Sequence, residues 1–136
     1  MRFTDRKDAG LQLADKILHY PEIIRLAREN LLVLSIPRGG VIIGDIVARV
    51  LGCPHDVLIV KKIGFPGNEE QAIGAIAENG TVLLNREMIS WGNVTPDEMQ
   101  GAIAKARTKV EYYVRTLRRG KALDVTDKTI ILVDDG

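Results

Sequence analysis

Residues 31–40 read Leu-Leu-Val-Leu-Ser-Ile-Pro-Arg-Gly-Gly, an apolar run that ends in turn residues. A continuous apolar run closed by proline and glycine is typical of a strand buried on both faces of a parallel sheet. Residues 41–51 follow with apolar side chains at a helical period, and Gly52 supplies a C-terminal stop. Because residues 56–60 can form the next strand, this region predicts a βαβ unit.

Two further apolar patterns extend the α/β alternation toward both ends of the chain. Residues 5–19 place apolar side chains on one helical face, with Asp5 as N-cap, and residues 129–133 form an apolar strand. Thr-Pro-Asp-Glu at residues 95–98 is a capping box, and it predicts a long helix to about residue 119. The order of elements indicates an α/β fold with a doubly wound parallel sheet.

The middle of the chain carries turn signals. Residues 61–70 hold two glycines and a proline in a largely polar stretch, which predicts a mobile loop. The apolar residues 72–77 and 81–84 flank an Asn-Gly pair, the strongest short-range signal of a β-hairpin. We expect this loop and hairpin to be additions to a single domain spanning residues 1–136.

Composition and charge narrow the classes of function. The 19 Lys and Arg and 18 Asp and Glu residues leave a net charge of +1, so no global field favours nucleic acid or an anionic membrane. The apolar runs are far shorter than the roughly 20 residues that cross a bilayer. Since Cys53 has no partner for an internal disulfide and charged residues follow Met1 closely, we expect a cytoplasmic protein.

Three groups of side chains follow predicted strands, at the edge where open α/β sheets bind ligands. They are the loop of Pro37, Arg38, Gly39 and Gly40, the pair Lys61 and Lys62, and the acid pair Asp134 and Asp135. The loop opens a helix, so its amides and its arginine can hold a phosphate or pyrophosphate. The acid pair can accept hydrogen bonds from vicinal hydroxyls or attract Mg²⁺.

Each group also has an ordinary alternative: a tight turn with a surface arginine, a solvated lysine pair and a polar strand terminus. Adjacent lysines on an extended chain point different ways, so we expect at most one of them to reach a given site. Taken together, however, the three groups describe a site for a sugar that carries phosphates.

Several segments of the chain resemble the type I phosphoribosyltransferases, in particular the predicted phosphoribosyltransferases of bacteria and archaea. The segments are residues 2–10, 36–41, 60–69, 72–75 and 131–136. The Pro-Arg-Gly-Gly loop and the Val-Asp-Asp-Gly strand end are the most specific of them. The resemblance implies a parallel doubly wound sheet with a flexible loop and hairpin insertion.

The resemblance also implies transfer of a 5-phosphoribosyl group from phosphoribosyl pyrophosphate (PRPP) to a nucleobase-like acceptor, with release of pyrophosphate. The Pro-Arg-Gly-Gly loop would bind pyrophosphate, often through a strained peptide, and Asp134 and Asp135 would bind the ribose hydroxyls. Residues 61–77 would close over the site, with Lys61 or Lys62 as the catalytic lysine at the leaving pyrophosphate. Mg²⁺ would bridge ligand oxygens without a direct protein ligand.

Members of this family continue past the Asp-Asp-Gly sequence with a loop and a helix that bind the 5-phosphate. We therefore expect a domain truncated within that motif, with its C-terminal part missing and little or no activity alone. Two alternatives are a non-catalytic regulator that binds PRPP or a nucleotide, because fold does not imply function, and a truncated fragment. The expected partners are small molecules, with room for a homodimer and with neither nucleic acid nor membrane.

Overall fold

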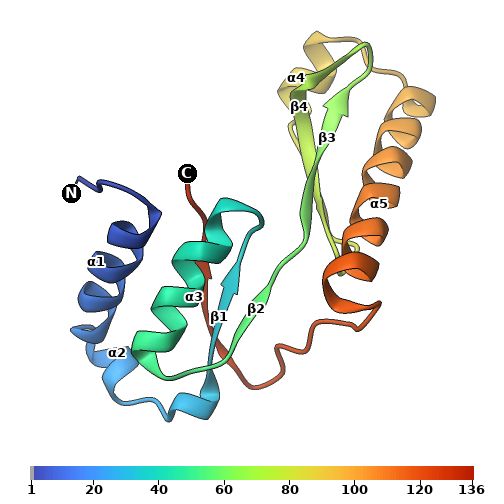
Figure 1. The fold of residues 1–136 in the computed structure, drawn as a ribbon. Helices are drawn as coiled ribbons and strands as arrows, with labels where there is room; N and C mark the ends of the chain where they lie inside the picture. Colours follow the sequence, from blue (N-terminus) through green and yellow to red (C-terminus); the bar gives the residue numbers. More distant parts are fainter. Residues whose placement is uncertain (1) are drawn as a thin grey trace. The chain divides into compact units, whose positions relative to one another are not determined.

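The computed structural model describes residues 2–136, which divide into two compact units. The parallel-sheet unit comprises the chain up to Leu58 together with Leu123–Gly136. The antiparallel unit comprises Ile59–Ala122. Figure 1 labels most of the helices and strands of both units, and each unit is described by itself.

A three-stranded parallel sheet ordered β2-β1-β6 forms the first unit. The central strand β1 (Leu31–Ser35) is buried along its whole length between β2 (His55–Val57) and β6 (Thr129–Val133). This position explains the unbroken apolar run, and it confirms the predicted α/β class with a parallel sheet. The register pairs Ser35 with Val133, so the segments that follow β1 and β6 start at the same edge.

Two helices complete the parallel-sheet unit, with α1 (Arg6–Leu18) packed on α3 (Gly39–Leu51) and α3 packed on the sheet. A Cβ added to Gly10 would lie 2.9 Å from the Cβ of Ile46, so the two helices approach closely at this glycine. The buried residues of this core are Ala9, Ala14, Val33, Ile43, Val47, Ala48, Leu51 and Val133. Two short elements, α2 (Pro21–Ile24) and the 3₁₀ turn η1 (Arg28–Asn30), connect α1 to β1.

The helix ends follow the predicted caps. The Asp5 carboxylate accepts a hydrogen bond from the Asp8 amide at 2.7 Å, and Gly52 ends α3 with a φ of 68°. Thr95 and Glu98 form the predicted capping box at the start of α5 (Pro96–Arg118). These local signals therefore confirm three of the predicted helices. None of the helices within residues 2–136 has the length and apolarity that crossing a bilayer requires.

The antiparallel unit has its own three-stranded sheet, ordered β3-β4-β5. Its strands are β3 (Val60–Phe65), β4 (Asn68–Ala77) and β5 (Val82–Leu84), and α5 packs along β3 and β4. The hairpin between β4 and β5 is the one that the Asn-Gly pair predicted. A short helix that was not predicted, α4 (Arg86–Trp91), begins at the N-cap Asn85.

The predicted mobile loop over residues 61–70 is wrong, because this segment forms most of a second hairpin. Only its proline and second glycine lie in the turn between β3 and β4, where Gly67 adopts a φ of 81°. The other glycine, Gly64, lies within β3 at shifts in register, and a Cβ there would lie 2.9 Å from the Cα of Glu69. The turn residues therefore mark one tight turn and one bulge.

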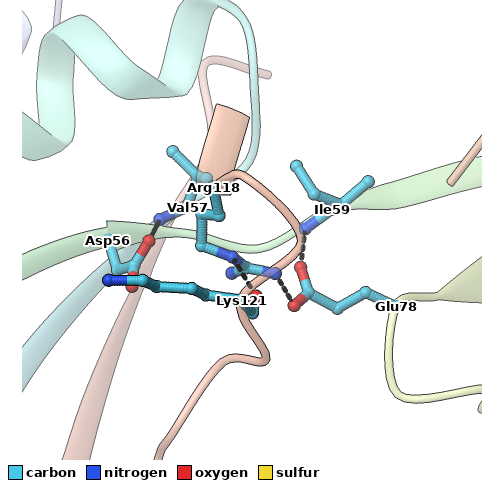
Figure 2. A network of polar contacts seen from close by, with 6 residues as sticks. All are labelled: Asp56, Val57, Ile59, Glu78, Arg118 and Lys121. Atoms are coloured by element: carbon cyan, nitrogen blue, oxygen red, sulfur yellow. Dashed lines mark hydrogen bonds and ion pairs between the residues drawn. The ribbon is translucent and has the colours of Figure 1, made fainter. Parts of the chain in front are cut away.

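A buried ion pair ties together the two ends of the antiparallel unit (Figure 2). The Arg118 guanidinium donates to the Glu78 carboxylate, and the two side chains are 9% and 6% exposed. The same carboxylate accepts from the amide of Ile59 at 2.8 Å, and Arg118 Nε donates to the carbonyl of Lys121 at 3.2 Å. Since Ile59 and Lys121 lie near the first and last residues of the unit, the ion pair closes it.

Candidate functional site

The glycine loop after β1 and the acid pair after β6 meet at one edge of the parallel sheet. A Cβ added to Gly39 would lie 1.8 Å from Oδ2 of Asp135, and one on Gly40 would lie 2.9 Å from the carbonyl oxygen of Val133. Both distances are too short for a carbon side chain, so glycine permits the loop to lie against the strand end. The structure thus brings together two of the three predicted groups.

The loop presents groups that suit an anion. The peptide bond between Pro37 and Arg38 is cis, and Arg38 occupies the N-cap position of α3. Gly39 and Gly40 form the first turn of this helix, where amides lack an intrahelical acceptor and the helix dipole favours negative charge. Within residues 2–136, no side chain or backbone group pairs with the Arg38 guanidinium. The first-turn amides and this guanidinium are therefore placed to hold an anion.

Arg6, which the sequence patterns did not single out, contacts both predicted groups. Its Nη2 and Nε donate to Oδ2 of Asp135 at 2.7 and 3.1 Å, and its Nε would lie 2.8 Å from a Cβ on Gly39. The hydrogen bond from Arg6 lowers the pKa of the Asp135 carboxyl, against a smaller opposing effect of burial. Asp135 is therefore an ionised acceptor whose Oδ2 is already engaged.

Hydrogen bonds around the start of α1 hold Arg6 in place. The amide of Asp8 donates to Asp5, while Asp8 Oδ2 accepts from the amide of Thr4 and from Gln12 Nε2, both at 2.9 Å. The hydrogen bond from Gln12 is the main cause that lowers the pKa of Asp8. This network fixes the segment before the helix, so Arg6 leaves the first turn with a defined direction.

Asp134 differs from its neighbour because it forms no ion pair within residues 2–136, and its Oδ1 accepts the amide of Asp135 at 2.9 Å. A cavity of about 420 Å³ lies beside both carboxylates. Its lining consists of Phe3, Asp5, Arg6, Ala9, Leu13, Ile43, Asp134 and Asp135. An apolar wall that ends in carboxylates and one guanidinium, at this size, is typical of a small-molecule site.

The donor groups at this edge suit Mg²⁺ only together with a ligand. No group of three or more His, Cys, Asp or Glu side chains that could hold a metal ion gathers within residues 2–136. Asp134 offers one carboxylate without a cationic partner, which is a hard oxygen donor of the kind that Mg²⁺ prefers. Since Mg²⁺ keeps several waters and commonly binds substrate phosphates, most of its ligands would come from a bound polyphosphate.

Lys61 and Lys62 lie on β3 in the antiparallel unit. The ammonium of Lys61 is 3.7 Å from the ring centroid of Tyr113, a cation–π contact. Both lysines line a second cavity, of about 520 Å³, between β3 and α5. Which of the two lysines reaches the predicted pyrophosphate site stays a prediction.

Residues 8–136 match the model of the phosphoribosyl transferase domain family. The chain belongs to this family. Two curated proteins from two strains of Mycobacterium tuberculosis, each named "Putative phosphoribosyl transferase", are 35% identical to it over 135 residues. The match covers 98% of this chain and 29% of each of those proteins. The chain therefore spans less than a third of the length of these relatives. For this reason the activity of the whole protein is treated as a proposal.

A solved structure shares the fold of this phosphoribosyl transferase domain. The crystal structure of TT1426 from Thermus thermophilus is 36% identical, with a TM-score of 0.70. The similarity covers 99% of this chain and 62% of that one. The family match includes the glycine loop, the lysine pair and the acid pair, whose individual roles stay predictions, whereas Arg6 lies outside the matched residues.

Proposed function

We propose that this phosphoribosyl transferase domain transfers a 5-phosphoribosyl group from PRPP to a nucleobase-like acceptor and releases pyrophosphate. The observation that carries the proposal is the close approach of Gly39 to Asp135, which puts an anion-binding loop next to a carboxylate. PRPP carries an anionic pyrophosphate and a vicinal diol on one small sugar, and these two features match the two groups. The two compact units would together form the single predicted domain.

The residues of the glycine loop would bind and orient the leaving group. Arg38 and the first-turn amides of Gly39 and Gly40 would hold the pyrophosphate oxygens. Mg²⁺, bound together with PRPP, would supply further neutralisation of the charge that develops on pyrophosphate. One of Lys61 and Lys62 would contact the same anion, on the basis of its charge and of the family resemblance.

The acid pair would orient the ribose. Because Arg6 engages Oδ2 of Asp135, the Oδ1 atom of that residue and the carboxylate of Asp134 are the acceptors left for the two ring hydroxyls. Carboxylates beside the ribose would also stabilise positive charge that develops on the sugar as pyrophosphate leaves. Fixing the sugar between loop and acid pair lowers the entropy cost of reaching the transition state.

Three finer predictions belong to the same proposal. A cytoplasmic location is supported by the lone Cys53, which has no partner for an internal disulfide. Small-molecule partners are supported by the net charge of +1, which offers no broad field to a polyanion. A homodimer is compatible with the family resemblance, and size-exclusion chromatography with light scattering would measure it.

Isothermal titration of the chain with PRPP, with and without Mg²⁺, tests the proposal. We expect Mg²⁺-dependent binding that is lost in Arg38→Ala and in Asp135→Asn. Arg49→Ala is the matched control, because Arg49 lies near the other end of α3 and pairs only with Asp45. Absence of PRPP binding by the folded chain would contradict the proposed site.

Turnover separates the enzyme from a regulator. Chains that bind PRPP would be supplied with purine and pyrimidine bases in turn, and the release of pyrophosphate would be measured. Release that depends on one class of base supports the transferase and identifies its acceptor class. Tight, Mg²⁺-dependent binding of PRPP without release for any base would instead support one of the two alternatives, a non-catalytic regulator or a truncated fragment.

A further inference from the structure

The antiparallel unit contains a cavity that the proposed function uses only in part. It measures about 520 Å³ and lies between β3 and α5. Four lysines line it, together with Phe65, Tyr113 and several small apolar residues. All of the lining residues belong to the antiparallel unit, and the volume lies within the range of small-molecule sites.

The cavity carries an excess of positive charge. Only two carboxylates line it, and both are engaged locally. Glu69 pairs with Lys105, whose hydrogen bond and charge lower the pKa of the glutamate. Glu98 accepts the amide of Thr95 at 3.1 Å in the capping box of α5. The lining therefore holds four ammonium groups and two carboxylates, and of the two carboxylates only that of Glu69 pairs with one of the lysines.

Two of the lysines form no ion pair among the described residues, although the charge of Lys109 adds to that of Lys105 in lowering the pKa of Glu69. Within residues 2–136, neither Lys62 nor Lys109 makes a hydrogen bond or an ion pair. Lys109 follows Lys105 by one turn of α5, so the two ammonium groups leave the same side of the helix. Like charges at this spacing repel each other, and an anion bound between β3 and α5 would relieve that repulsion.

The lining also has apolar residues, and they include an aromatic ring. Phe65 and Pro66 come from the end of β3 and its turn, and Ala102 and Ala106 come from α5. A Cβ added to Gly92 would lie 2.3 Å from the Phe65 ring, so the ring packs directly against the backbone after α4. A ring held in this way offers a surface on which a planar group can stack.

We propose that this cavity binds a small aromatic phosphate of the nucleoside monophosphate kind. Lys62 and Lys109 bind the phosphate as separate point charges, and the planar group lies against Phe65 and the apolar wall. The site is complete within the antiparallel unit. Binding there consequently depends neither on the Pro-Arg-Gly-Gly loop nor on turnover.

The test uses adenosine 5′-monophosphate as the probe, with adenosine and inorganic phosphate as its two halves. Titration calorimetry would measure affinity, and methyl NMR spectra would follow Ala102 and Ala106. We expect these two methyl signals to shift with the nucleotide, and each half to bind at least about tenfold more weakly, as expected when a charge-assisted or stacking contact is lost.

Charge variants locate the site. Lys109→Gln is expected to weaken nucleotide binding about tenfold, the loss typical of a charge-assisted hydrogen bond. Arg107→Gln is the matched control, since Arg107 is an exposed basic residue on the same helix outside the lining, and its affinity stays unchanged. The Arg38→Ala variant is expected to keep nucleotide affinity while it loses PRPP.

Four results would overturn the inference. The first is that the folded chain does not bind the nucleotide, and the second is that inorganic phosphate or adenosine binds as tightly as the nucleotide does. The third is that Lys109→Gln and Arg107→Gln weaken nucleotide binding equally, and the fourth is that Arg38→Ala abolishes nucleotide binding. Because PRPP binding is scored separately through Arg38, failure of the second site and failure of the proposed transferase are distinguishable.

Discussion

Arg6 and Asp135 are 129 positions apart in the sequence, yet Arg6 Nη2 lies 2.7 Å from Asp135 Oδ2. The ion pair joins the first residue of α1 to the segment after β6, directly beside Gly39. It fixes the orientation of the carboxylate while it leaves the Oδ1 atom for a ligand. The site at this sheet edge is therefore built from three segments, and the one that holds Arg6 was marked only by the family resemblance of residues 2–10 and not by a motif of its own.

Arg6→Gln removes the guanidinium whose hydrogen bond and charge hold the pKa of Asp135 below its ordinary value of 3.8. Because the folded pKa is depressed, the pair stabilises the fold above that ordinary value, and the contribution is lost as the pH falls through the folded pKa. We expect Arg6→Gln to raise the pKa of Asp135, measured by carboxyl NMR titration, and to weaken PRPP binding. Lys7→Gln, at the exposed neighbouring position, serves as control, and equal effects of both variants would contradict the assigned role.

Gly39→Ala introduces a Cβ that would lie 1.8 Å from Asp135 Oδ2. The carboxylate is the end of a flexible side chain, so it can swing away, and the fold should remain close to its original stability. The displaced carboxylate no longer faces the ribose, and we expect PRPP affinity to fall at least about tenfold, because small displacements at a reacting site are costly. Calorimetry measures the affinity.

Gly101→Ala is the control for this substitution, since a Cβ there meets nothing within 4 Å. It lies in α5, where alanine stabilises a helix by about 1 kcal/mol relative to glycine, so its unfolding free energy should rise. PRPP affinity that stays unchanged in Gly39→Ala would show that the loop and the acid pair do not bind one ligand.

Glu78→Gln removes the carboxylate that pairs with the buried Arg118 guanidinium. Loss of one member of a buried pair costs about 3–5 kcal/mol, and we expect a loss of unfolding free energy of this order by urea denaturation. Glu69→Gln is the matched control because the Glu69–Lys105 pair is largely exposed, and it should cost less than about 1 kcal/mol. Similar losses in the two variants would show that the buried pair does not close its unit.

His55 predicts a pH dependence of stability at mildly acidic pH. Its Nε2 is hydrogen-bonded to the buried Ser35 Oγ at 2.7 Å, and burial lowers the pKa of His55 below 6.5 against the opposing charges of Asp45 and Asp56. The unfolded chain therefore takes up the proton first, so stability is lost as the pH falls from 6.5 toward the lower folded pKa.

Urea midpoints measured between about pH 7.5 and about pH 5, on either side of the ordinary histidine pKa, check this prediction. His55→Gln should remove the dependence, and His19→Gln, at an exposed position, should leave it unchanged. A midpoint that falls equally with pH in all three proteins would assign the effect to other groups.

Most elements of the fold were predictable because their signals are local. The strand from Thr129 to Val133, the cap at Asp5, the capping box at Thr95 and the hairpin at the Asn-Gly pair each depend on a few neighbouring residues. The segment around Gly64 and Gly67 was misread for the same reason. Glycine and proline indicate turns, and the alternation within two short strands is a weaker signal than either.

The candidate site was predictable only in part. The glycine loop and the acid pair follow apolar strands, so the rule that ligands bind beyond the carboxyl ends of strands finds them. Arg6 could not be found in this way, because an ion pair over 129 positions leaves no periodic or local pattern. The contact of Lys61 with Tyr113 depends equally on how α5 packs along β3.

The buried pair of Glu78 and Arg118 also bears on how this domain can diversify. It binds Ile59 and Lys121 into one network, so the chain enters and leaves the antiparallel unit at neighbouring points. A segment whose two ends lie close together can be replaced or lengthened without a change in the strand register of the domain that carries it. Sequence variation can therefore accumulate within residues 59–122 while β1, β2 and β6 keep the pairing that brings the glycine loop and the acid pair together.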